Sequence, residues 1–237
     1  CKVRICDCVS CPHKVINRQA EYYQHMTCRG LAYHDAAAYA EPAVAGMTTQ
    51  AREPSIVPSD ALQRTPRAPA QPAERCTQRL FLPTNDATLY ALDLHDGQPC
   101  EAFGEGGRVD LKIGLGDDAL GVYLPTSPPV VTEKLVIVGG SVTDNGSVDS
   151  PGGVIRAYDV HDGHLVWNWD SNNPDDTKPL AAGKMYSRNS ANMWSIASVD
   201  EDLGMIYLPL GNQTPDQWGA TPYDQRLCRI PFGRAHV

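Results

Sequence analysis

Hydrophobic positions in this chain fall into short runs of aliphatic, β-branched and aromatic residues, with Gly, Pro, Asp and Asn between them. Runs of this kind predict strands at residues 79–83, 135–138 and 205–209. No long amphipathic helix is evident, and only the Ala-rich stretch 35–45 favours one or two helical turns. The pattern therefore predicts an all-β protein.

Two segments share the pattern Ala-(Leu or Tyr)-Asp-x-His-Asp-Gly, at residues 91–97 and 157–163. An Asp-Gly pair supports the positive φ of a tight turn, so each copy predicts a strand, a turn and a return strand. The second copy continues into Trp167 and Trp169, alternate side chains that can pack between neighbouring sheets. Repeated hairpins with Trp are typical of β-propeller blades of ~40–50 residues. The two copies lie further apart, which indicates an insertion, placed at residues 110–124.

Charge and apolar content narrow the possible partners. The 237 residues carry a formal net charge of −8, whereas binding to nucleic acid requires clustered Lys and Arg, so no nucleic-acid partner is expected. No apolar run approaches the ~20 residues of a membrane helix, and no secretory signal peptide opens the chain. The chain is therefore interpreted either as a mature protein or as a fragment.

Four of the eight cysteines crowd the start of the chain: Cys1, Cys6, Cys8 and Cys11, with His13 nearby. One interpretation is a zinc knuckle. The spacing is not a pair of C-x-x-C hairpins, however, and no second pair follows at ligand distance, so a zinc site is disfavoured.

Two other cysteines, Cys76 and Cys100, flank one strand-rich unit. They could pair in an oxidising compartment. The sequence leaves this pairing open, because a separation between Cα atoms cannot be read from it.

Three segments, taken together and in order, resemble the membrane-bound, pyrroloquinoline quinone (PQQ)-dependent glucose dehydrogenases. They are residues 21–30 (Glu-Tyr-Tyr-Gln-His-Met-Thr-Cys-Arg-Gly), 140–145 (Gly-Ser-Val-Thr-Asp-Asn) and 192–194 (Asn-Met-Trp). The resemblance implies a partial eight-bladed β-propeller from an enzyme that oxidises the C1 hydroxyl of glucose or another aldose to the lactone and passes electrons to ubiquinone. It also implies the periplasmic face of the bacterial inner membrane, with membrane helices upstream of Cys1.

The resemblance is uneven along the chain. Residues 21–225 are expected to form propeller blades, whereas segments 1–20 and 226–237 match the family poorly and suggest a partial reading of a gene. Residues 47–74 are rich in Thr, Ala, Pro, Gln and Arg with little apolar periodicity, which favours a loop or a disordered insert.

PQQ is a planar tricyclic quinone with three carboxylates, so its site needs a flat surface and cationic donors. Trp194 offers a plane for stacking, and the resemblance places it against one side of the quinone, although a lone Trp is otherwise more typical of a blade core. The guanidinium of Arg29 suits a carboxylate. The resemblance places His25 near the other face of the ring.

A hard cation is the remaining requirement. Asp144 and Asn145 are adjacent oxygen donors that follow a strand, which suits Ca²⁺ or Mg²⁺, although an Asn-Gly turn without a ligand is the alternative. Thr214 matches a further family position close to the metal and the cofactor. The metal would polarise the quinone carbonyl as a Lewis acid.

No catalytic residue is assigned in this chain. The family's proton-accepting Asp and a nearby Lys lie further toward the C-terminus, and neither has a match here. Two alternatives stay open: a related quinoprotein alcohol dehydrogenase, and a non-catalytic propeller that scaffolds outer-membrane protein assembly. Such a scaffold would be expected to lack His25, Arg29 and the Asp144–Asn145 pair.

Overall fold

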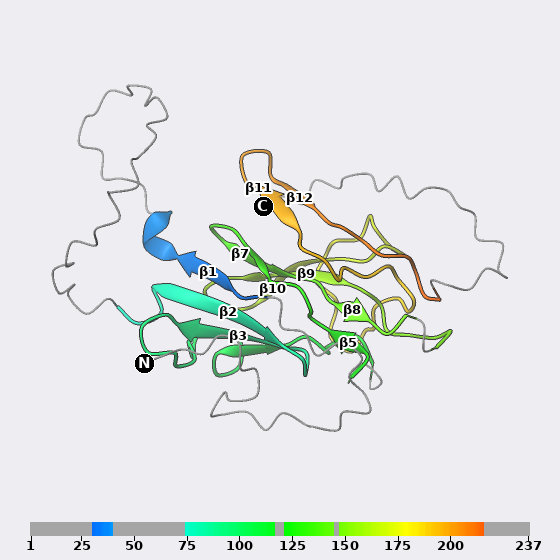
Figure 1. The fold of residues 1–237 in the computed structure, drawn as a ribbon, viewed down its shortest axis with the longest axis horizontal. Helices are drawn as coiled ribbons and strands as arrows, with labels where there is room; N and C mark the ends of the chain where they lie inside the picture. The colour runs from blue at the N-terminus through cyan, green and yellow to red at the C-terminus, as the bar shows by residue number, and fades with distance from the viewer. Residues whose placement is uncertain (1–29, 40–73, 117–120, 145–146, 216–237) are drawn as a thin grey trace, which may run out of the picture.

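The computed structural model describes residues 30–39, 74–116, 121–144 and 147–215 (Figure 1), and the statements below concern these residues. They form short strands and one 3-10 turn, which confirms the predicted all-β class. In chain order the elements are β1 (Ala32–Asp35), η2 (Ala36–Ala38), β2 (Gln78–Thr84), β3 (Thr88–Asp93), β4 (Arg108–Asp110), β5 (Tyr123–Leu124), β6 (Val130–Val131), β7 (Leu135–Val138), β8 (Ser141–Val142), β9 (Ile155–Asp159), β10 (Leu165–Trp169), β11 (Ser198–Asp200) and β12 (Met205–Tyr207).

Two four-stranded antiparallel sheets dominate the architecture. The first sheet has the order β1-β2-β3-β4, and the second has the order β10-β9-β7-β6. Each is an up-and-down meander, the usual form of a propeller blade. The strands predicted at 79–83, 135–138 and 205–209 coincide with β2, β7 and β12.

The remaining strands form two small sheets, β5-β8 and β11-β12. The predicted insertion at residues 110–124 begins where β4 ends and leads into β5. β8 lies in the chain between β7 and β9, two strands of the second sheet, but it pairs with β5 outside that sheet.

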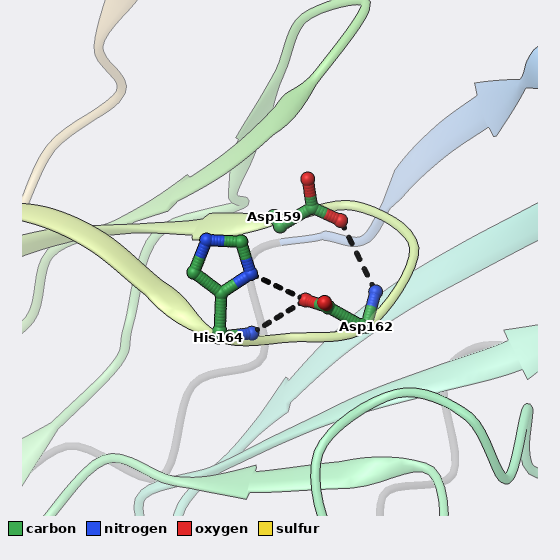
Figure 2. A group of neighbouring side chains, drawn as sticks. All are labelled: Asp159, Asp162 and His164. Atoms are coloured by element: carbon green, nitrogen blue, oxygen red, sulfur yellow. Dashed lines mark hydrogen bonds and ion pairs between the residues drawn. The ribbon is translucent and has the colours of Figure 1, made fainter.

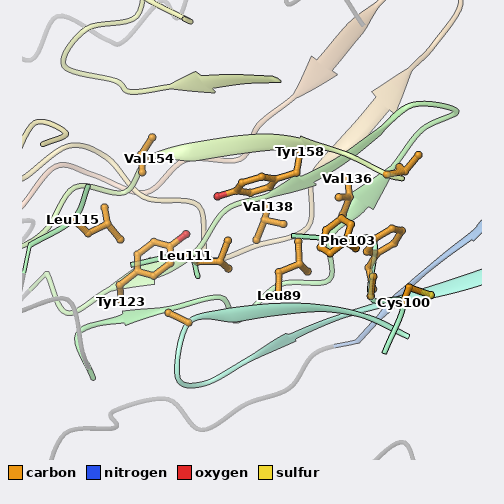
Figure 3. Close-up of a cluster of buried hydrophobic side chains, with 14 of the residues drawn as sticks. Leu89, Cys100, Phe103, Leu111, Leu115, Tyr123, Val136, Val138, Val154 and Tyr158 are labelled. Carbon is orange, nitrogen blue, oxygen red and sulfur yellow. The ribbon is translucent and has the colours of Figure 1, made fainter. Parts of the chain in front are cut away.

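One cluster of buried side chains fills the space between the two large sheets (Figure 3). Leu89 faces it from β3, and Val136, Val138 and Tyr158 face it from β7 and β9. Alternate side chains of a strand point to opposite faces, so β7 also presents Leu135 to the other side of the second sheet.

The second cluster covers that other face. Trp167 and Trp169 of β10 are only 7% and 8% exposed, and they pack with Ile137 and with Ile206 of β12. The prediction that these tryptophans pack between sheets is therefore confirmed. The second sheet is covered on both faces, as an internal blade of a propeller is.

The turn after β3 is built by the first copy of the repeated pattern. Oδ1 of Asp93 accepts hydrogen bonds from the backbone N–H groups of His95 (2.8 Å) and Asp96 (3.2 Å). The N–H of Gly97 donates to the Asp93 carbonyl at 2.9 Å, with φ of 70° at the glycine.

The turn after β9 repeats this arrangement. Oδ1 of Asp159 accepts from the N–H groups of His161 (2.7 Å) and Asp162 (3.1 Å). The N–H of Gly163 donates to the Asp159 carbonyl at 3.0 Å, with φ of 73°. Both predicted Asp-Gly turns are therefore confirmed.

The return strands differ, and one prediction is wrong. After Gly163 the chain enters β10, which pairs with β9 as predicted. After Gly97 the chain makes only an isolated bridge between Leu92 and Pro99, and the next strand, β4, starts at Arg108. The N–H of Cys100 still donates to the carbonyl of Ala91 at 2.8 Å, but the N–H of Ala91 donates to the carbonyl of Gly107 at 2.9 Å, so the pairing with β3 passes to the segment of β4.

A disulfide and a buried arginine complete the first sheet's connections. Cys76 and Cys100 form a disulfide with a Cα–Cα separation of 5.8 Å, the pairing that the sequence left open. Nη1 of Arg79 donates to the carbonyls of Val160 (2.6 Å) and His161 (2.8 Å), so β2 is tied directly to the turn after β9.

Several sequence expectations fall outside the described residues. These are the segments 1–20 and 226–237, residues 47–74 apart from Glu74, and the N-terminal cysteines with His13. Of the stretch 35–45, the described part contains the 3-10 turn η2. Among the described residues, no helix has the length and apolar character needed to cross a membrane.

Candidate cofactor and metal site

Three of the six predicted site residues, His25, Arg29 and Asn145, lie outside the described residues. The neighbour of Arg29 in the sequence, Gly30, is described. A Cβ at Gly30 would lie 3.1 Å from Cγ of Pro128, so the chain there lies against the loop after β5.

Asp144 lies just beyond the end of β8. Thr143 extends the β5-β8 pairing through a hydrogen bond from its N–H to the carbonyl of Val122 (2.9 Å), and its own carbonyl accepts from Oγ of Ser150 (3.0 Å). Asp144 is half-buried, and its Oδ2 accepts a hydrogen bond from Nδ2 of Asn192 at 3.2 Å. The carboxylate therefore leaves an anchored strand end and faces residue 192.

Trp194 differs from the core tryptophans because it is 49% exposed. A Cβ at Gly211 would lie 3.0 Å from Nε1 of Trp194, so glycine lets the 211 backbone approach the indole closely. The N–H of Gly211 also donates to the carbonyl of Asn192 at 2.8 Å. A half-exposed indole held in this way offers a plane that a flat ligand can stack on.

Thr214 is buried, at 4% exposure, and its N–H donates to the carbonyl of Asn189 at 3.2 Å. Asn189 in turn accepts, at Oδ1, a hydrogen bond from the N–H of Ser150 at 2.7 Å. These contacts join the Thr214 segment to the loop that follows Asp144.

Hydrogen bonds and close contacts through Asn192, Gly211, Asn189 and Ser150 thus link the segments that carry Asp144, Trp194 and Thr214. Two buried oxygens in this region, Oδ1 of Asn192 and Oγ1 of Thr214, have no hydrogen-bond partner among the described residues. A buried acceptor left unpaired costs about 1–3 kcal/mol, which a bound cation or ligand donor would offset. Carboxylate, amide and hydroxyl oxygens are the donors that Ca²⁺ and Mg²⁺ prefer, so the residues present fit such a cation beside a planar ligand.

Sequence reasoning did not assign three polar residues near these segments. Asn192 belongs to the segment 192–194 that carries the family resemblance, but the resemblance assigns a role only to Trp194 in that segment. Thr126 and Ser127, in the loop after β5, are buried, and their hydroxyls have no partner among the described residues. Nothing in a single sequence distinguishes such hydroxyls from those on an exposed loop.

A second group of possible ligands, Asp159, Asp162 and His164, lies at the turn after β9 (Figure 2). Oδ1 of Asp162 accepts from the backbone N–H of His164 at 2.9 Å and lies 2.6 Å from its ring Nδ1. These hydrogen bonds lower the pKa of the exposed Asp162 carboxyl. In the turn after β3 the equivalent bond runs from the N–H of Gln98 to Asp96, so the group is accounted for as turn structure.

Arg156 is a fully buried cation on β9, on the face that looks toward the first sheet. Its guanidinium carbon lies 5.3 Å from the ring centroid of Tyr123 and 5.7 Å from that of Tyr186. Burial raises the pKa of Tyr186 to about 12, so this ring stays neutral and its face attracts the cation. The guanidinium of Arg156 therefore packs against both tyrosine rings.

Comparison with known proteins identifies relatives over most of the chain. The PQQ family described as "Glucose/ethanol/alcohol dehydrogenase, beta-propeller domain" matches residues 12–227. Quinoprotein glucose dehydrogenase of Gluconobacter oxydans (strain 621H) is 37% identical over 199 residues, covering 83% of this chain and 22% of that protein. The protein of the same name from Escherichia coli (strain K12) is 35% identical over 210 residues, covering 88% and 23%.

A relative with a different name is similar to nearly the same extent. Quinate/shikimate dehydrogenase (quinone) of Acinetobacter baylyi (strain ATCC 33305 / BD413 / ADP1) is 34% identical over 206 residues, covering 86% of this chain and 23% of that protein. The chain thus spans less than a quarter of the length of these three curated relatives.

Proposed function

This chain belongs to the PQQ glucose/ethanol/alcohol dehydrogenase β-propeller family, and on that premise we propose that it forms blades of a quinoprotein glucose dehydrogenase. The proposed reaction is the oxidation of the C1 hydroxyl of glucose or another aldose to the lactone. The two electrons released would pass to ubiquinone. Family membership and the candidate site favour this enzyme over a non-catalytic scaffold.

The observation that supports a cofactor site most directly is two buried oxygens without a hydrogen-bond partner among the described residues. They are Oγ1 of Thr214 and Oδ1 of Asn192, the residue whose Nδ2 donates to Asp144. When bound, PQQ supplies a two-electron acceptor, and Ca²⁺ or Mg²⁺ supplies a Lewis acid. In the proposal, Asp144, Asn145 and Thr214 bind the cation.

The remaining candidates bind the organic ligand in this proposal. Trp194 stacks on one face of the planar ring and His25 lies near the other face. Arg29 binds a carboxylate, for which its planar fork of N–H donors is suited. The chain's contribution is to bind, orient and partly enclose the cofactor, and no residue is proposed as the general base.

We also propose that the protein acts at the periplasmic face of the bacterial inner membrane. The Cys76–Cys100 disulfide supports an oxidising compartment outside the cytoplasm. Membrane association would come from a region upstream of this chain, as the resemblance implies.

A quinoprotein that acts on another alcohol is the second candidate. The quinate/shikimate dehydrogenase is 34% identical to this chain, against 35% and 37% for the two glucose dehydrogenases, so identity alone does not separate the substrates. Substrate preference therefore has to be measured.

The test uses the full-length protein that contains this chain, reconstituted with PQQ and Ca²⁺. Dye-linked oxidation of glucose, quinate and ethanol is compared, and the proposal expects glucose to be the best substrate. A preference for quinate or ethanol would select the second candidate, and no PQQ-dependent oxidation of any of them would overturn both.

Two variants address the site itself. Asp144→Ala is expected to weaken metal-dependent reconstitution, and Trp194→Ala is expected to weaken retention of PQQ. Retention is measured as the absorbance of PQQ that stays with the protein through gel filtration. Ile196→Ala, at an exposed position two residues from Trp194, is the matched control and should retain PQQ. Equal retention of PQQ by wild type, Trp194→Ala and Ile196→Ala would contradict the assignment of Trp194.

The 237-residue chain alone is expected not to oxidise glucose, even with PQQ and Ca²⁺. It holds no match to the family's proton-accepting Asp, and general-base catalysis is typically worth ~10²–10⁴ in rate. An incomplete propeller also exposes sheet edges that favour aggregation. A rate near that of a full-length relative would show that a base exists within these residues.

A further inference from the structure

Asn192 is fully buried, and the direction of its side-chain amide is determined by its partner. Its Nδ2 lies 3.2 Å from Oδ2 of Asp144. An ionised carboxylate can only accept hydrogen bonds, so the NH₂ end must face Asp144. The carbonyl end, Oδ1, consequently takes no part in this bond.

That oxygen has no hydrogen-bond partner among the described residues, although it is buried. Leaving an amide oxygen in this state costs about 1–3 kcal/mol. The NH₂ end of Asn192 is thus paired with Asp144 and its Oδ1 is unpaired, so a cation or a ligand donor at Oδ1 would offset this cost.

The backbone of Asn192 is held firmly on two sides. Its carbonyl accepts from the N–H of Gly211 at 2.8 Å. A Cβ at Gly153 would lie 2.2 Å from Cα of Asn192, so only glycine at 153 permits this close packing of the two backbones. Trp194 follows two residues later and Thr214 lies three residues beyond Gly211, so the same short segments carry the candidate ligands.

We propose that Asn192 is an additional residue of the metal site, where its NH₂ group positions the carboxylate of Asp144 and its Oδ1 supplies one more oxygen donor toward the cation. This inference rests on the proposed function, because it assumes that Asp144 binds a metal. Groups that orient metal ligands typically contribute 10–100-fold to metal affinity. Asn192→Ala should therefore weaken Ca²⁺ binding about 10–100-fold.

The experiment measures thermal unfolding of the full-length protein with PQQ present, as Ca²⁺ is titrated. Asn192→Ala should lower the melting temperature without Ca²⁺ and also reduce the increase caused by Ca²⁺. Asn192→Asp keeps the shape but places a second carboxylate beside Asp144. The two like charges should destabilise the calcium-free protein, and Ca²⁺ should then raise its melting temperature by more than in the wild type.

Asn168→Ala is the matched control, since Asn168 is another buried asparagine and its Oδ1 accepts from Oη of Tyr186 at 3.3 Å. It should lower the melting temperature and leave the Ca²⁺-dependent increase unchanged. If the wild type shows no Ca²⁺-dependent increase, the metal site of the proposed function fails.

If the wild type responds but Asn192→Ala and Asn192→Asp respond to Ca²⁺ as Asn168→Ala does, the role of Asn192 is overturned and the proposed function stands. Should Asn192→Ala not fold, the isosteric Asn192→Asp decides alone. An enlarged Ca²⁺ response then supports the role, and an unchanged response refutes it.

Discussion

The turns after β3 and β9 share a sequence pattern and a set of backbone hydrogen bonds, yet their surroundings differ. Asp93 is only 2% exposed and accepts a third bond, from the N–H of Cys76 to its Oδ2 at 2.6 Å. Asp159 is half-buried, and its hydrogen bonds to backbone N–H groups come only from within its own turn among the described residues. The shared residues specify the turn, whereas the neighbours determine how much each side chain contributes to stability.

The glycines show the opposite asymmetry. A Cβ at Gly97 would meet no atom within 4 Å, whereas a Cβ at Gly163 would lie 2.8 Å from the backbone nitrogen of Gly104. The second turn is therefore packed against the chain of the first sheet, where Gly104 also donates to the carbonyl of Asp162 at 2.7 Å. The first turn is instead tied down by its disulfide.

Removing the disulfide should be the largest single effect. The Cys76→Ala, Cys100→Ala double variant should lose about 3 kcal/mol of unfolding free energy, because a cross-link over some two dozen residues restricts the unfolded chain. Urea denaturation with and without reductant measures this. Wild type should lose stability on reduction and the variant should not; equal curves for both oxidised proteins would contradict the expectation.

Replacing the two turn glycines with alanine should cost more unfolding free energy in the second turn than in the first. Gly97→Ala should cost about 1 kcal/mol, the cost of a left-handed φ for a residue with a Cβ. Gly163→Ala should cost roughly 2–3 kcal/mol, because the added Cβ also meets the backbone of Gly104. Urea denaturation of the matched pair tests the difference, and equal losses would mean that the contact with Gly104 yields easily.

The paired substitutions Asp93→Asn and Asp159→Asn should instead cost more unfolding free energy in the first turn than in the second. An Asn at 93 must turn an NH₂ group toward the N–H of Cys76 or give up its other bonds, so it should cost about 2 kcal/mol. At 159 one amide oxygen can still accept both bonds, so the loss should stay under about 1 kcal/mol. An equal cost at both sites would show that the bond from Cys76 contributes nothing to stability.

Much of this architecture follows from local pattern. The short aliphatic and aromatic runs at 79–83 and 135–138 identified β2 and β7, and the Asp-Gly pairs identified both turns. The predicted return strand after Gly97 was wrong because the chain turns away from β3 at Cys100, whose carbonyl accepts from the N–H of Phe103 at 2.8 Å. A local sequence pattern predicts where a strand can form, but it does not by itself show where that strand stops pairing with its neighbour.

The candidate site was less accessible from sequence. Asp144, Trp194 and Thr214 were selected by resemblance, and their contacts could not be derived from spacing. Asn192 contacts Asp144 across 48 residues of chain, and its unpaired oxygen is visible only once both are placed. Burial is a property of the packed molecule, so buried polar groups such as Thr126 are not distinguishable in the sequence from exposed ones.

The smallest expected effect is a pH dependence confined to the first turn. Burial acts to raise the pKa of Asp93, but the N–H donors of Cys76, His95 and Asp96 outweigh it, so the pKa in the folded state is lowered.

A lowered folded-state pKa stabilises the protein at pH values above the unfolded pKa, which is about 3.9, and this stabilisation is lost as the pH falls through the folded value. The stability advantage of wild type over Asp93→Asn should therefore be smaller at pH about 3 than at pH about 6, where the carboxylate is fully ionised in both states. Urea denaturation of both proteins at the two pH values measures it, with Asp159→Asn as the control for general acid effects. An advantage that stays constant or grows on acidification would show that the ionised form of Asp93 is not the form that the three donors stabilise.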